Sequence, residues 1–589
     1  MKKQSMRDPT FGASLLPSGA TRFRLWAPAQ ASVTVEVEGL PAAPMRPVGE
    51  GWFEAELPCG AGARYLYRLA NGLAVPDPAS RAQADDVHGP SLVVDPRGYE
   101  WRHAGWRGRP WHETVLYELH TGAFGGFAGV QAALPILADL GVTAVELMPV
   151  NDFPGKRNWG YDGVLPFAPD RSYGTPDELK ALVDAAHGVG LMMFLDVVYN
   201  HFGPDGNYLS AYAPQFFRDD IATPWGAAID FRRPEVRRYF TENALYWLDE
   251  YRFDGLRFDA VHAISEADWL DEMAAEVRGS IGPGRHVHLV LEHDGNVADH
   301  LRRDFDAQWN DDAHHVLHAL LTGESDGYYA DYADRPARHL ARALSEGFVY
   351  QGDPSAYRGG ETRGTPSADL PPTSFVLFLQ NHDQIGNRPF GDRLTEHVAP
   401  ELLEAAVALQ LLCPHVPMIF MGEEEATRSP FLYFTDHAGD LAEAVREGRR
   451  REFSGFKGFA PGESISSIPD PNAPETFARS RLAPDAEGGA ARRRLYRELL
   501  GIRRDLLIPR LDGATSLGAS FVEPGTVVAR WRMGDGSTLL LACNLGCEPA
   551  QIERVQGDLL HESRPGAANA ARGGRIAGAT TVALLVPPS

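Results

Sequence analysis

The first part of the chain alternates between hydrophobic and polar residues in short runs. The pattern is clearest in residues 21–27, 32–38, 51–57 and 63–69, and glycine and proline separate these runs. Alternating runs between turn residues indicate β-strands with one apolar face. Such strands are typical of antiparallel sheets that pack face to face. Residues 1–97 are therefore predicted to form an immunoglobulin-like β-sandwich.

From about residue 112 the pattern changes to short apolar runs that alternate with stretches of helical periodicity. Eight apolar runs are predicted strands: 114–119, 143–148, 192–198, 255–258, 288–291, 305–309, 375–379 and 417–421. The predicted helices between and after them include 128–140, 176–189, 234–251, 266–278, 401–412 and 493–506. Eight strand–helix units in one chain favour an α/β fold, a (β/α)8 TIM barrel over residues 98–511.

Two connections inside the predicted barrel are long, at residues 201–233 and 322–372. Structureless connections of this length are uncommon unless they are functional, so we expect both to overhang the active face. The alternating pattern returns near the end of the chain, in residues 526–532, 538–544 and 580–586. Residues 512–589 are therefore predicted to form a small C-terminal β-sheet domain.

The overall charge narrows the class of partner. The chain has 589 residues and a net charge of −23, so it repels nucleic acids and anionic membrane surfaces on average, whereas a neutral substrate meets no such penalty. The N-terminus lacks the apolar segment of a signal peptide, and no apolar run is long enough to span a bilayer. We expect a soluble cytoplasmic protein that binds neither nucleic acid nor membrane; its oligomeric state stays open.

Three carboxylates follow predicted barrel strands. Asp259 ends the fourth strand, Glu292 follows the fifth and Asp383 follows the seventh. Catalytic residues of such barrels lie at these strand ends, so the three should converge at one mouth, although a single Asp there often only caps the next helix. Arg257 shares a strand face with Asp259 and would keep it ionised. Cleavage of a glycosidic bond needs such a set: an acid for the leaving oxygen and a carboxylate for the anomeric carbon.

Four segments resemble the short motifs of the α-amylase family of glycoside hydrolases: Asp196–His201, Gly255–Asp259, Leu291–Glu292 and Gln380–Asp383. The resemblance implies a retaining mechanism with Asp259 as nucleophile and Glu292 as general acid/base. It implies that Asp383 binds sugar hydroxyls in the transition state. The substrate-binding residues that it implies, together with neighbours in the same motifs, are Arg257, His201, His382, Tyr161, Trp159, Asn200 and His262.

Longer segments resemble a narrower group, the maltooligosyltrehalose trehalohydrolases. These segments are residues 153–163, 200–209, 259–264 and 431–437, and the resemblance covers nearly the whole chain. It implies hydrolysis of the α-1,4-glucosidic bond next to the terminal trehalose unit of maltooligosyltrehalose, a trehalose-capped α-1,4-glucan. Free trehalose and a maltooligosaccharide would be the products, and no cofactor or metal is implied.

Two alternative functions remain open at this stage. A glucan branching enzyme uses the same scaffold and the same covalent intermediate, and only the acceptor differs. A non-catalytic glucan-binding protein would also share the barrel, but such relatives typically lose a catalytic carboxylate, and all three are present here. On the loop after the third strand, Trp225 and Phe202 are either sugar platforms or anchors of the loop.

Overall fold

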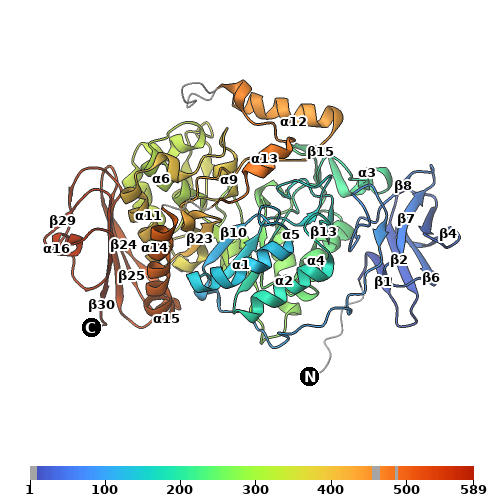
Figure 1. The fold of residues 1–589 in the computed structure, drawn as a ribbon, viewed down its shortest axis with the longest axis horizontal. Coiled ribbons are helices and arrows are strands. Elements are labelled where there is room, and N and C mark those ends of the chain that lie inside the picture. The colour runs from blue at the N-terminus through green and yellow to red at the C-terminus, as the bar shows by residue number, and fades with distance from the viewer. Residues whose placement is uncertain (1–8, 454–463, 484–487, 589) are drawn as a thin grey trace.

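The computed structural model describes residues 9–453, 464–483 and 488–588. The first eight residues of the segment on which the signal-peptide prediction depends lie outside this set. Three groups of elements follow one another along the longest axis of the molecule (Figure 1). The N-terminal sheets lie at one end, the barrel lies in the middle, and the C-terminal sheet lies at the other end.

The middle group is a closed barrel of parallel strands arranged in chain order. Its strands are β10 (Leu116–Leu119), β11 (Ala144–Leu147), β14 (Met192–Val197), β17 (Gly255–Phe258), β18 (His288–Leu291), β19 (Ala307–Trp309), β22 (Phe375–Leu377) and β23 (Val416–Phe420). Each coincides with one of the eight predicted strands, so the predicted TIM barrel is confirmed. The first and last strands pair directly, which closes the barrel.

Side chains that point into the barrel form layers, as expected for parallel strands around a filled centre. The lower part is apolar and includes Leu116, Ala144, Met192, Phe194, Val290 and Val376. Gly255 leaves room there, because a Cβ at this position would lie 2.1 Å from an atom of the Phe194 ring. Two residues further along their strands, the inward positions carry Glu118, Glu146, Asp196 and Arg257. This charged layer lies directly below the mouth of the barrel.

Helices cover the outside of the barrel. They include α1 (Phe127–Leu140), α2 (Pro176–Gly188), α4 (Pro234–Asp249), α5 (Asp268–Ser280), α6 (Asp311–Thr322), α11 (Pro400–Leu412) and α14 (Gly489–Ile502). The six predicted helices are therefore present. The last one begins four residues earlier than predicted and continues through a π-helical turn, Arg503–Leu507, into α15 (Ile508–Leu511).

The two long connections have more secondary structure than the sequence pattern suggested. Residues 201–233 contain α3 (Leu209–Tyr212) and a hairpin of β15 (Phe217–Thr223) and β16 (Gly226–Ile229). Residues 322–372 contain the helices α7 (Ala330–Ala333) and α8 (Pro336–Glu346) and the short strands β20 (Asp353–Pro354) and β21 (Thr362–Arg363). The helix α8 has Pro336 in its first turn and buries Ala337, Leu340, Ala341 and Leu344. Proline there and this apolar spacing are helix signals, which shows that the connection is a folded excursion.

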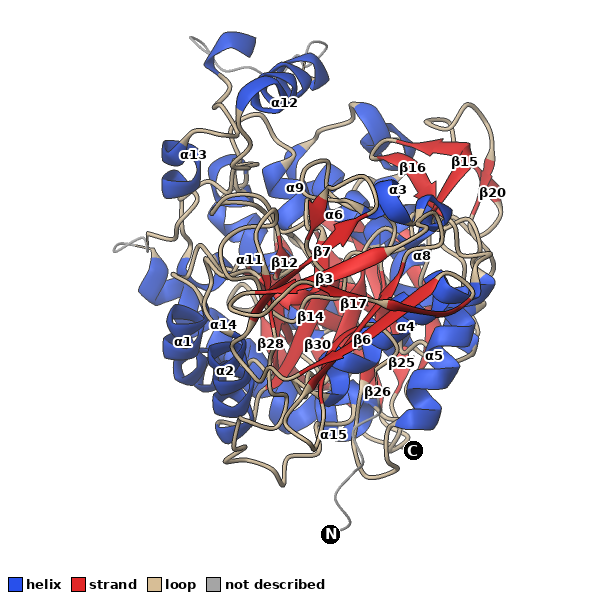
Figure 2. Cartoon of the chain, turned by 90° about the vertical axis from the view of Figure 1, so that its right-hand side faces the viewer, coloured by secondary structure: helices blue, strands red, loops and turns tan. Residues whose placement is uncertain are grey.

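The N-terminal group consists of two antiparallel sheets. One is ordered β1-β2-β6-β5, with β1 at Gly12–Leu15 and β5 at Arg46–Gly49, and the other is ordered β4-β3-β7-β8, with β4 at Ala43–Pro44 and β8 at Ala74–Val75. Four of these strands, β2 (Thr21–Trp26), β3 (Val33–Val37), β6 (Trp52–Leu57) and β7 (Arg64–Leu69), match the four predicted runs. Phe23 from one sheet packs on Tyr65 from the other, with 4.8 Å between ring centroids. The predicted sandwich is therefore present. Its strands lie in front of the barrel strands β14 and β17 in Figure 2.

The C-terminal group is a five-stranded antiparallel sheet, ordered β24-β25-β26-β30-β28. Its strands are β24 (Thr515–Val522), β25 (Thr526–Arg532), β26 (Thr538–Asn544), β28 (Asp558–Glu562) and β30 (Thr580–Val586). The sheet attaches to the barrel helices, because Trp531 Nε1 donates to the carbonyl oxygen of Leu344 and Thr581 Oγ1 to that of Ala405. The domain boundaries at 97/98 and 511/512 stay predictions.

Two further observations concern the described part of the chain as a whole. None of its helices is long and apolar enough to cross a bilayer. The four cysteines, Cys59, Cys413, Cys543 and Cys547, are all free thiols.

Candidate active site

Arg257 lies at the centre of the charged layer and is fully buried. Its Nη1 lies 2.6 Å from Asp196 Oδ2 and 2.9 Å from Asp259 Oδ1, and its Nη2 lies 2.8 Å from Glu292 Oε2. Burial alone would lower the pKa of the guanidinium, but the charges of Asp196 and Glu292 outweigh burial and hold that pKa well above its usual value. One permanent positive charge therefore joins the predicted nucleophile and the predicted acid.

Asp259 is the first residue after strand β17, where the chain leaves the barrel wall. Asn200 Nδ2 donates to Asp259 Oδ2 at 3.0 Å and to the backbone carbonyl oxygen of Asp259 at 3.1 Å. Because Arg257 contacts the other carboxylate oxygen, donors hold both oxygens. The side chain is fixed in one orientation and yet remains 11% exposed at the mouth.

Glu292 follows strand β18, and its Oε2 accepts two hydrogen bonds. One comes from Arg257, and the other comes from the backbone N–H of Ala260 at 2.7 Å. Ala260 has a φ of 39°, in the left-handed region that side chains other than glycine rarely adopt. The unusual backbone directly after Asp259 is therefore coupled to the position of Glu292, and strain of this kind concentrates at functional sites.

His382 begins the short helix α9 (His382–Gly386) after strand β22. Its Nδ1 contacts Glu118 Oε1, and its backbone N–H donates to Glu118 Oε2 at 3.1 Å. On the opposite side of the ring, Nε2 lies 2.8 Å from the Tyr161 hydroxyl, which donates to Asp196 Oδ2 at 2.6 Å. Burial alone would lower the pKa of His382, but the charges of Asp383 and Glu118 outweigh burial and raise that pKa to about 9.

Asp383 is the most accessible of the three predicted catalytic carboxylates. Its side chain is 45% exposed. Oδ1 lies 3.3 Å from the donor Asn387 Nδ2 and 3.6 Å from His382 Nε2. The structure therefore brings Asp259, Glu292 and Asp383 to one mouth, as the sequence predicted, and Asp383 is the one that faces open space.

His201 lies on another side of the mouth, at the start of the long connection after β14. Its Nδ1 contacts Asn200 Oδ1, and its Nε2 lies 2.9 Å from the Tyr161 carbonyl oxygen. The indole of Trp225 stacks on the imidazole, with 4.5 Å between centroids and 13° between planes. Trp225 is nevertheless 46% exposed, so one face of its ring is free for a ligand.

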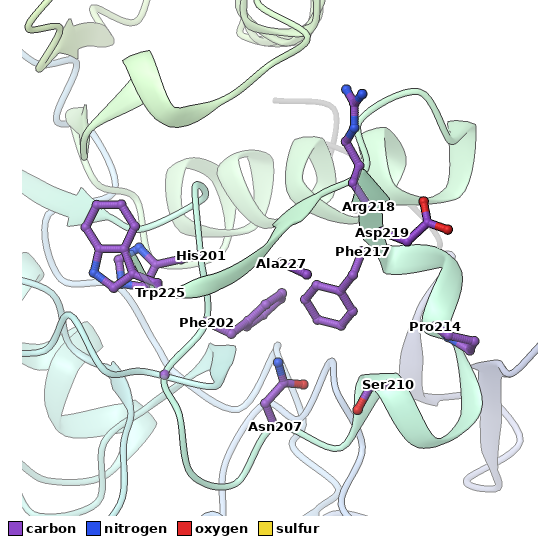
Figure 3. Close-up of a pocket in the computed structure, with 11 residues that line it drawn as sticks. His201, Phe202, Asn207, Ser210, Pro214, Phe217, Arg218, Asp219, Trp225 and Ala227 are labelled. Carbon is purple, nitrogen blue, oxygen red and sulfur yellow. The ribbon is translucent and has the colours of Figure 1, made fainter. Parts of the chain in front are cut away.

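A pocket of about 390 Å³ continues from this stack, and we call it the Trp225 pocket. Figure 3 shows the pair of Trp225 and His201 at one end of it, with Phe202 and Phe217 beside each other further along. The remaining lining residues are Gly203, Asn207, Ser210, Pro214, Arg218, Asp219 and Ala227. The first long connection therefore builds a partly aromatic pocket next to the mouth.

A second pocket of about 340 Å³ contains Glu292 and Asp383, and we call it the Glu292 pocket. It is strongly polar. Its other lining residues are His262, Asp294, Asp311, His314, His315, Tyr328, Asp331, Tyr332, Tyr357, Arg358, Arg363, Asn381, Gln384 and Asn387. Six of them belong to the second long connection, 322–372. Both long connections thus reach the active face, as predicted.

Two predicted substrate-binding residues lie in contrasting places. His262 is exposed and lines the Glu292 pocket. Trp159 is only 4% exposed, and its Nε1 donates to the carbonyl oxygen of Leu432 at 2.9 Å. The edge of its ring packs against His382, with 5.6 Å between centroids. Trp159 therefore lies behind His382, on the protein side of the site.

Sequence reasoning missed two kinds of residue. Glu118 and Glu146 are the second-to-last residues of the first and second strands, so a search for residues directly after a strand, which found Asp259, passes over them. The other group comes from outside the strand ends, and Tyr328, Tyr357 and Arg363 are examples from the second long connection. No sequence pattern marked these residues as members of the site.

Within residues 9–453, 464–483 and 488–588, no group of three or more histidine, cysteine, aspartate or glutamate side chains is arranged to hold a metal ion. Glu292 and Asp294 are close in sequence but do not form a pair of metal ligands, because Asp294 forms ion pairs with Arg358 and Arg363.

Comparison with known proteins places this geometry in a family. The α-amylase catalytic domain model matches residues 94–220, and a model of a domain of unknown function, DUF3459, matches residues 514–584. A crystal structure of a protein assigned as an alpha amylase from Salmonella typhimurium is 44% identical and covers 99% of this chain and 100% of its own, with a TM-score of 0.92. Pullulanase from Anoxybacillus, at 18% identity and a TM-score of 0.70, shares the fold.

The curated relatives are more specific. The malto-oligosyltrehalose trehalohydrolase of Deinococcus radiodurans is 46% identical over 94% of this chain and 92% of its own length. The enzyme of the same name from Rhizobium sp. is 38% identical over 92% and 94%. A branching enzyme from Jannaschia is 36% identical, but over only 42% of this chain. The chain therefore belongs to the malto-oligosyltrehalose trehalohydrolase family, within the glycoside hydrolases that have the α-amylase catalytic barrel.

Proposed function

We propose that this chain hydrolyses the α-1,4-glucosidic bond next to the terminal trehalose unit of maltooligosyltrehalose and releases trehalose and a maltooligosaccharide. The observation that carries the proposal is the position of Arg257, which contacts both Asp259 and Glu292. A double displacement at an anomeric carbon requires two carboxyl groups at one site, and Arg257 holds two of them together at the barrel mouth.

In the first step, an oxygen of the Asp259 carboxylate attacks the anomeric carbon of the glucose at the cleaved bond. Glu292 donates a proton to the glycosidic oxygen, that bond breaks, and trehalose leaves. Both contacts on Glu292 use Oε2, so Oε1 is the oxygen that exchanges the proton. Arg257 stabilises the ionised Asp259, and Asn200 orients it, so little reorganisation is needed when the bond forms.

In the second step, water attacks the same carbon from the side that trehalose vacated. Glu292 accepts the proton of that water, the bond to Asp259 breaks, and the maltooligosaccharide leaves with its original anomeric configuration. Asp383, which is half-exposed, grips hydroxyls of the reacting sugar, together with His382 and His201. Tyr161 stacks on that sugar, while Trp159 supports His382 from behind.

The two pockets favour a direction for the substrate. Glu292 protonates the leaving group, so the trehalose unit lies on the side of Glu292. The Glu292 pocket is lined by charged and hydroxyl-bearing side chains, His262 among them, which suit the many hydroxyls of a disaccharide. The glucan chain then extends toward Trp225, whose free indole face is suited to stack on a pyranose ring.

The test compares two substrates: maltotriosyltrehalose and maltopentaose, which have the same number of glucose units. We expect free trehalose and maltotriose from the first, and slow or no cleavage of the second. Proton NMR of the fresh maltotriose should show the α-anomer before mutarotation. Release of β-anomer would exclude the retaining mechanism. Branched or elongated products without trehalose would instead support a branching enzyme.

A further inference from the structure

We propose that Glu118 is a positioning residue for the reaction, because it holds His382 as a doubly protonated imidazolium at the edge of the mouth. The proposal rests on the function proposed above for its catalytic meaning. The protonation state itself rests only on the hydrogen bonds around His382 and can be measured without substrate.

The hydroxyl of Tyr161 decides the state of one ring nitrogen. This hydroxyl has a single proton, and it lies between Asp196 Oδ2 at 2.6 Å and His382 Nε2 at 2.8 Å. Asp196 Oδ2 also accepts from Arg257 Nη1 at 2.6 Å, so this oxygen is an acceptor toward both neighbours. The Tyr161 proton therefore points to Asp196, and the Tyr161 oxygen must accept a proton from His382 Nε2.

Glu118 decides the state of the other ring nitrogen. Its two carboxylate oxygens face two donors of the same residue, the Nδ1 and the backbone N–H of His382. A carboxylate that receives the backbone N–H on one oxygen and faces Nδ1 with the other favours a proton on Nδ1. Both nitrogens of His382 then carry protons, and the ring is positively charged.

The packing around the ring makes this charge dependent on Glu118. Both side chains are 1% exposed, so water contributes little to either charge, and each needs the other. The titratable or charged groups that act on His382 from the surrounding elements are Glu118, Glu146, Tyr161, Arg257, His120 and, on its own helix, Asp383. Among them, Glu118 is the carboxylate within hydrogen-bond distance of Nδ1, whereas the half-exposed Asp383 lies 3.6 Å from Nε2.

A second histidine, His120, which follows the strand β10 that carries Glu118, shows that the charged state of His382 is not general for buried histidines here. His120 follows β10 by one residue and is also buried. Its Nδ1 accepts from the backbone N–H of Ala123 at 3.0 Å, and its Nε2 lies 2.8 Å from the carbonyl oxygen of Asn158. Burial lowers the pKa of His120 to about 4, so this ring is neutral. Without a carboxylate on Nδ1, a buried histidine at this level of the barrel loses its charge.

The charge on His382 affects the reaction because the ring lies next to Asp383 and Tyr161. His382 Nε2 is 3.6 Å from Asp383 Oδ1, and the ring stacks against Tyr161 with 5.1 Å between centroids. A charged N–H at this point donates a stronger hydrogen bond than a neutral one, either to Tyr161 or to a sugar hydroxyl that takes its place. Glu118 thus acts on the substrate through His382, without touching the substrate.

The experiment uses the full chain with isotopically labelled histidine. Nitrogen NMR distinguishes an imidazolium, whose two nitrogens resonate close together, from a neutral ring, whose nitrogens resonate far apart. The signal that disappears in His382→Gln is assigned to His382. In the wild type at pH 7.5 we expect the imidazolium pattern for His382 and the neutral pattern for His120.

Glu118→Gln keeps the shape of the side chain and removes its charge. We expect the pKa of His382 to fall by at least about one pH unit, and kcat/KM at pH 8 to fall on the order of tenfold. Glu146→Gln is the matched control, because Glu146 lies opposite Glu118 on the neighbouring strand and acts on His382 only through space, without a hydrogen bond or ion pair among the described residues. This control should change the pKa of His382 much less than Glu118→Gln does.

A neutral His382 in the wild type at pH 7.5 would overturn the proposal, and so would an unchanged His382 titration in Glu118→Gln. If Glu118→Gln does not fold, Glu118→Asp provides the second variant, since it keeps the charge but shortens the side chain. His382 should then stay charged with a lower pKa than in the wild type, and an equal or higher pKa would also overturn the proposal. A chain that releases no trehalose, yet shows the expected spectra, would refute the proposed function and leave this inference intact.

Discussion

Six carboxyl groups occupy two levels of the barrel, and the two levels differ in access and in partners. At the mouth, Glu292 is 17% exposed, Asp259 is 11% exposed and Asp383 is 45% exposed. One layer below, the side chains of Glu118, Glu146 and Asp196 are exposed by 1–2%. The upper three can touch a substrate, and the lower three cannot.

The difference teaches how a barrel can hold so many acids at one end. Burial raises the pKa of Asp196 to about 7 in spite of Arg257, and burial and the charges of Glu118 and Asp196 hold the pKa of Glu146 well above its usual range. In the lower level, burial thus favours the protonated forms of Asp196 and Glu146, while Asp196 pairs with Arg257 and Glu118 pairs with His382. The carboxyl groups of the upper level stay in position because the lower level holds the two cations, Arg257 and His382, next to them.

The largest expected effect is at the mouth. Asp259→Asn should reduce kcat on maltotriosyltrehalose on the order of 10⁴-fold or more, because the amide cannot form the glucosyl–enzyme bond. Urea unfolding should give a free energy close to that of the wild type, since Arg257 keeps Asp196 and Glu292. A variant that retains a tenth of the wild-type rate would show that Asp259 is not the nucleophile.

Glu292→Gln should have the next largest effect, and one that depends on the leaving group. Trehalose needs a proton as it leaves, so its release should fall on the order of 10³-fold. Maltooligosyl fluoride needs no such proton, and its first cleavage step should remain close to the wild-type rate. Equal losses on the two substrates would contradict the role of Glu292 as the acid.

Asp196→Asn tests the lower level, where activity and stability should fall together. At pH 8, above the Asp196 pKa of about 7, the variant removes the charge that pairs with buried Arg257, and breaking a buried ion pair costs about 3 kcal/mol or more. Urea unfolding should register that loss, and kcat should fall because Arg257 is less well held. An unfolding free energy equal to that of the wild type would show that the lower level does not stabilise the fold through its pairing with Arg257.

The pH dependence of stability tests the charge on His382. The folded pKa of about 9 lies above the ordinary value of 6.5, so the stabilisation is complete below pH 6.5 and is lost as the pH rises through 9. The difference corresponds to on the order of 3 kcal/mol. The gap in unfolding free energy between the wild type and His382→Gln should therefore shrink between pH 6.5 and 9. A constant gap over this range would contradict a charged His382.

The smallest effect is expected for Glu146→Gln. Burial and the charges of Glu118 and Asp196 raise the pKa of its side chain, which favours the uncharged form, and its Oε2 has no hydrogen-bond partner among the described residues. An amide of the same shape should change the unfolding free energy by less than about 1 kcal/mol. A large loss would show that Glu146 is ionised and paired after all.

The barrel and the three carboxylates at its mouth could both be predicted from the sequence, but for different reasons. The eight strands are short apolar runs between helices, and this periodicity is a local property of the chain. Asp259, Glu292 and Asp383 could be found because parallel strands end at one face, which turns positions in sequence into neighbours in space.

The lower level and the pockets could not be predicted in the same way. Glu118 also lies near a strand end, but its role depends on contact with His382, which lies 264 positions away in the chain. Trp159 was predicted as a sugar contact from its motif, and only packing against Leu432 and His382 places it behind the site. Tyr328 and Arg363 belong to the second long connection, 322–372, and no local pattern in the sequence places them near Glu292.

The bridge formed by Arg257 has a consequence for how this gene can change over time. The one side chain of Arg257 contacts both the proposed nucleophile and the proposed acid, so most substitutions at position 257 should disturb both residues in one step. Partial losses are therefore hard to reach there, and selection can adjust the rate only through neighbouring positions. Variation that alters which glucans are accepted should accordingly accumulate in the two long connections, while the arginine stays fixed in every lineage that remains active.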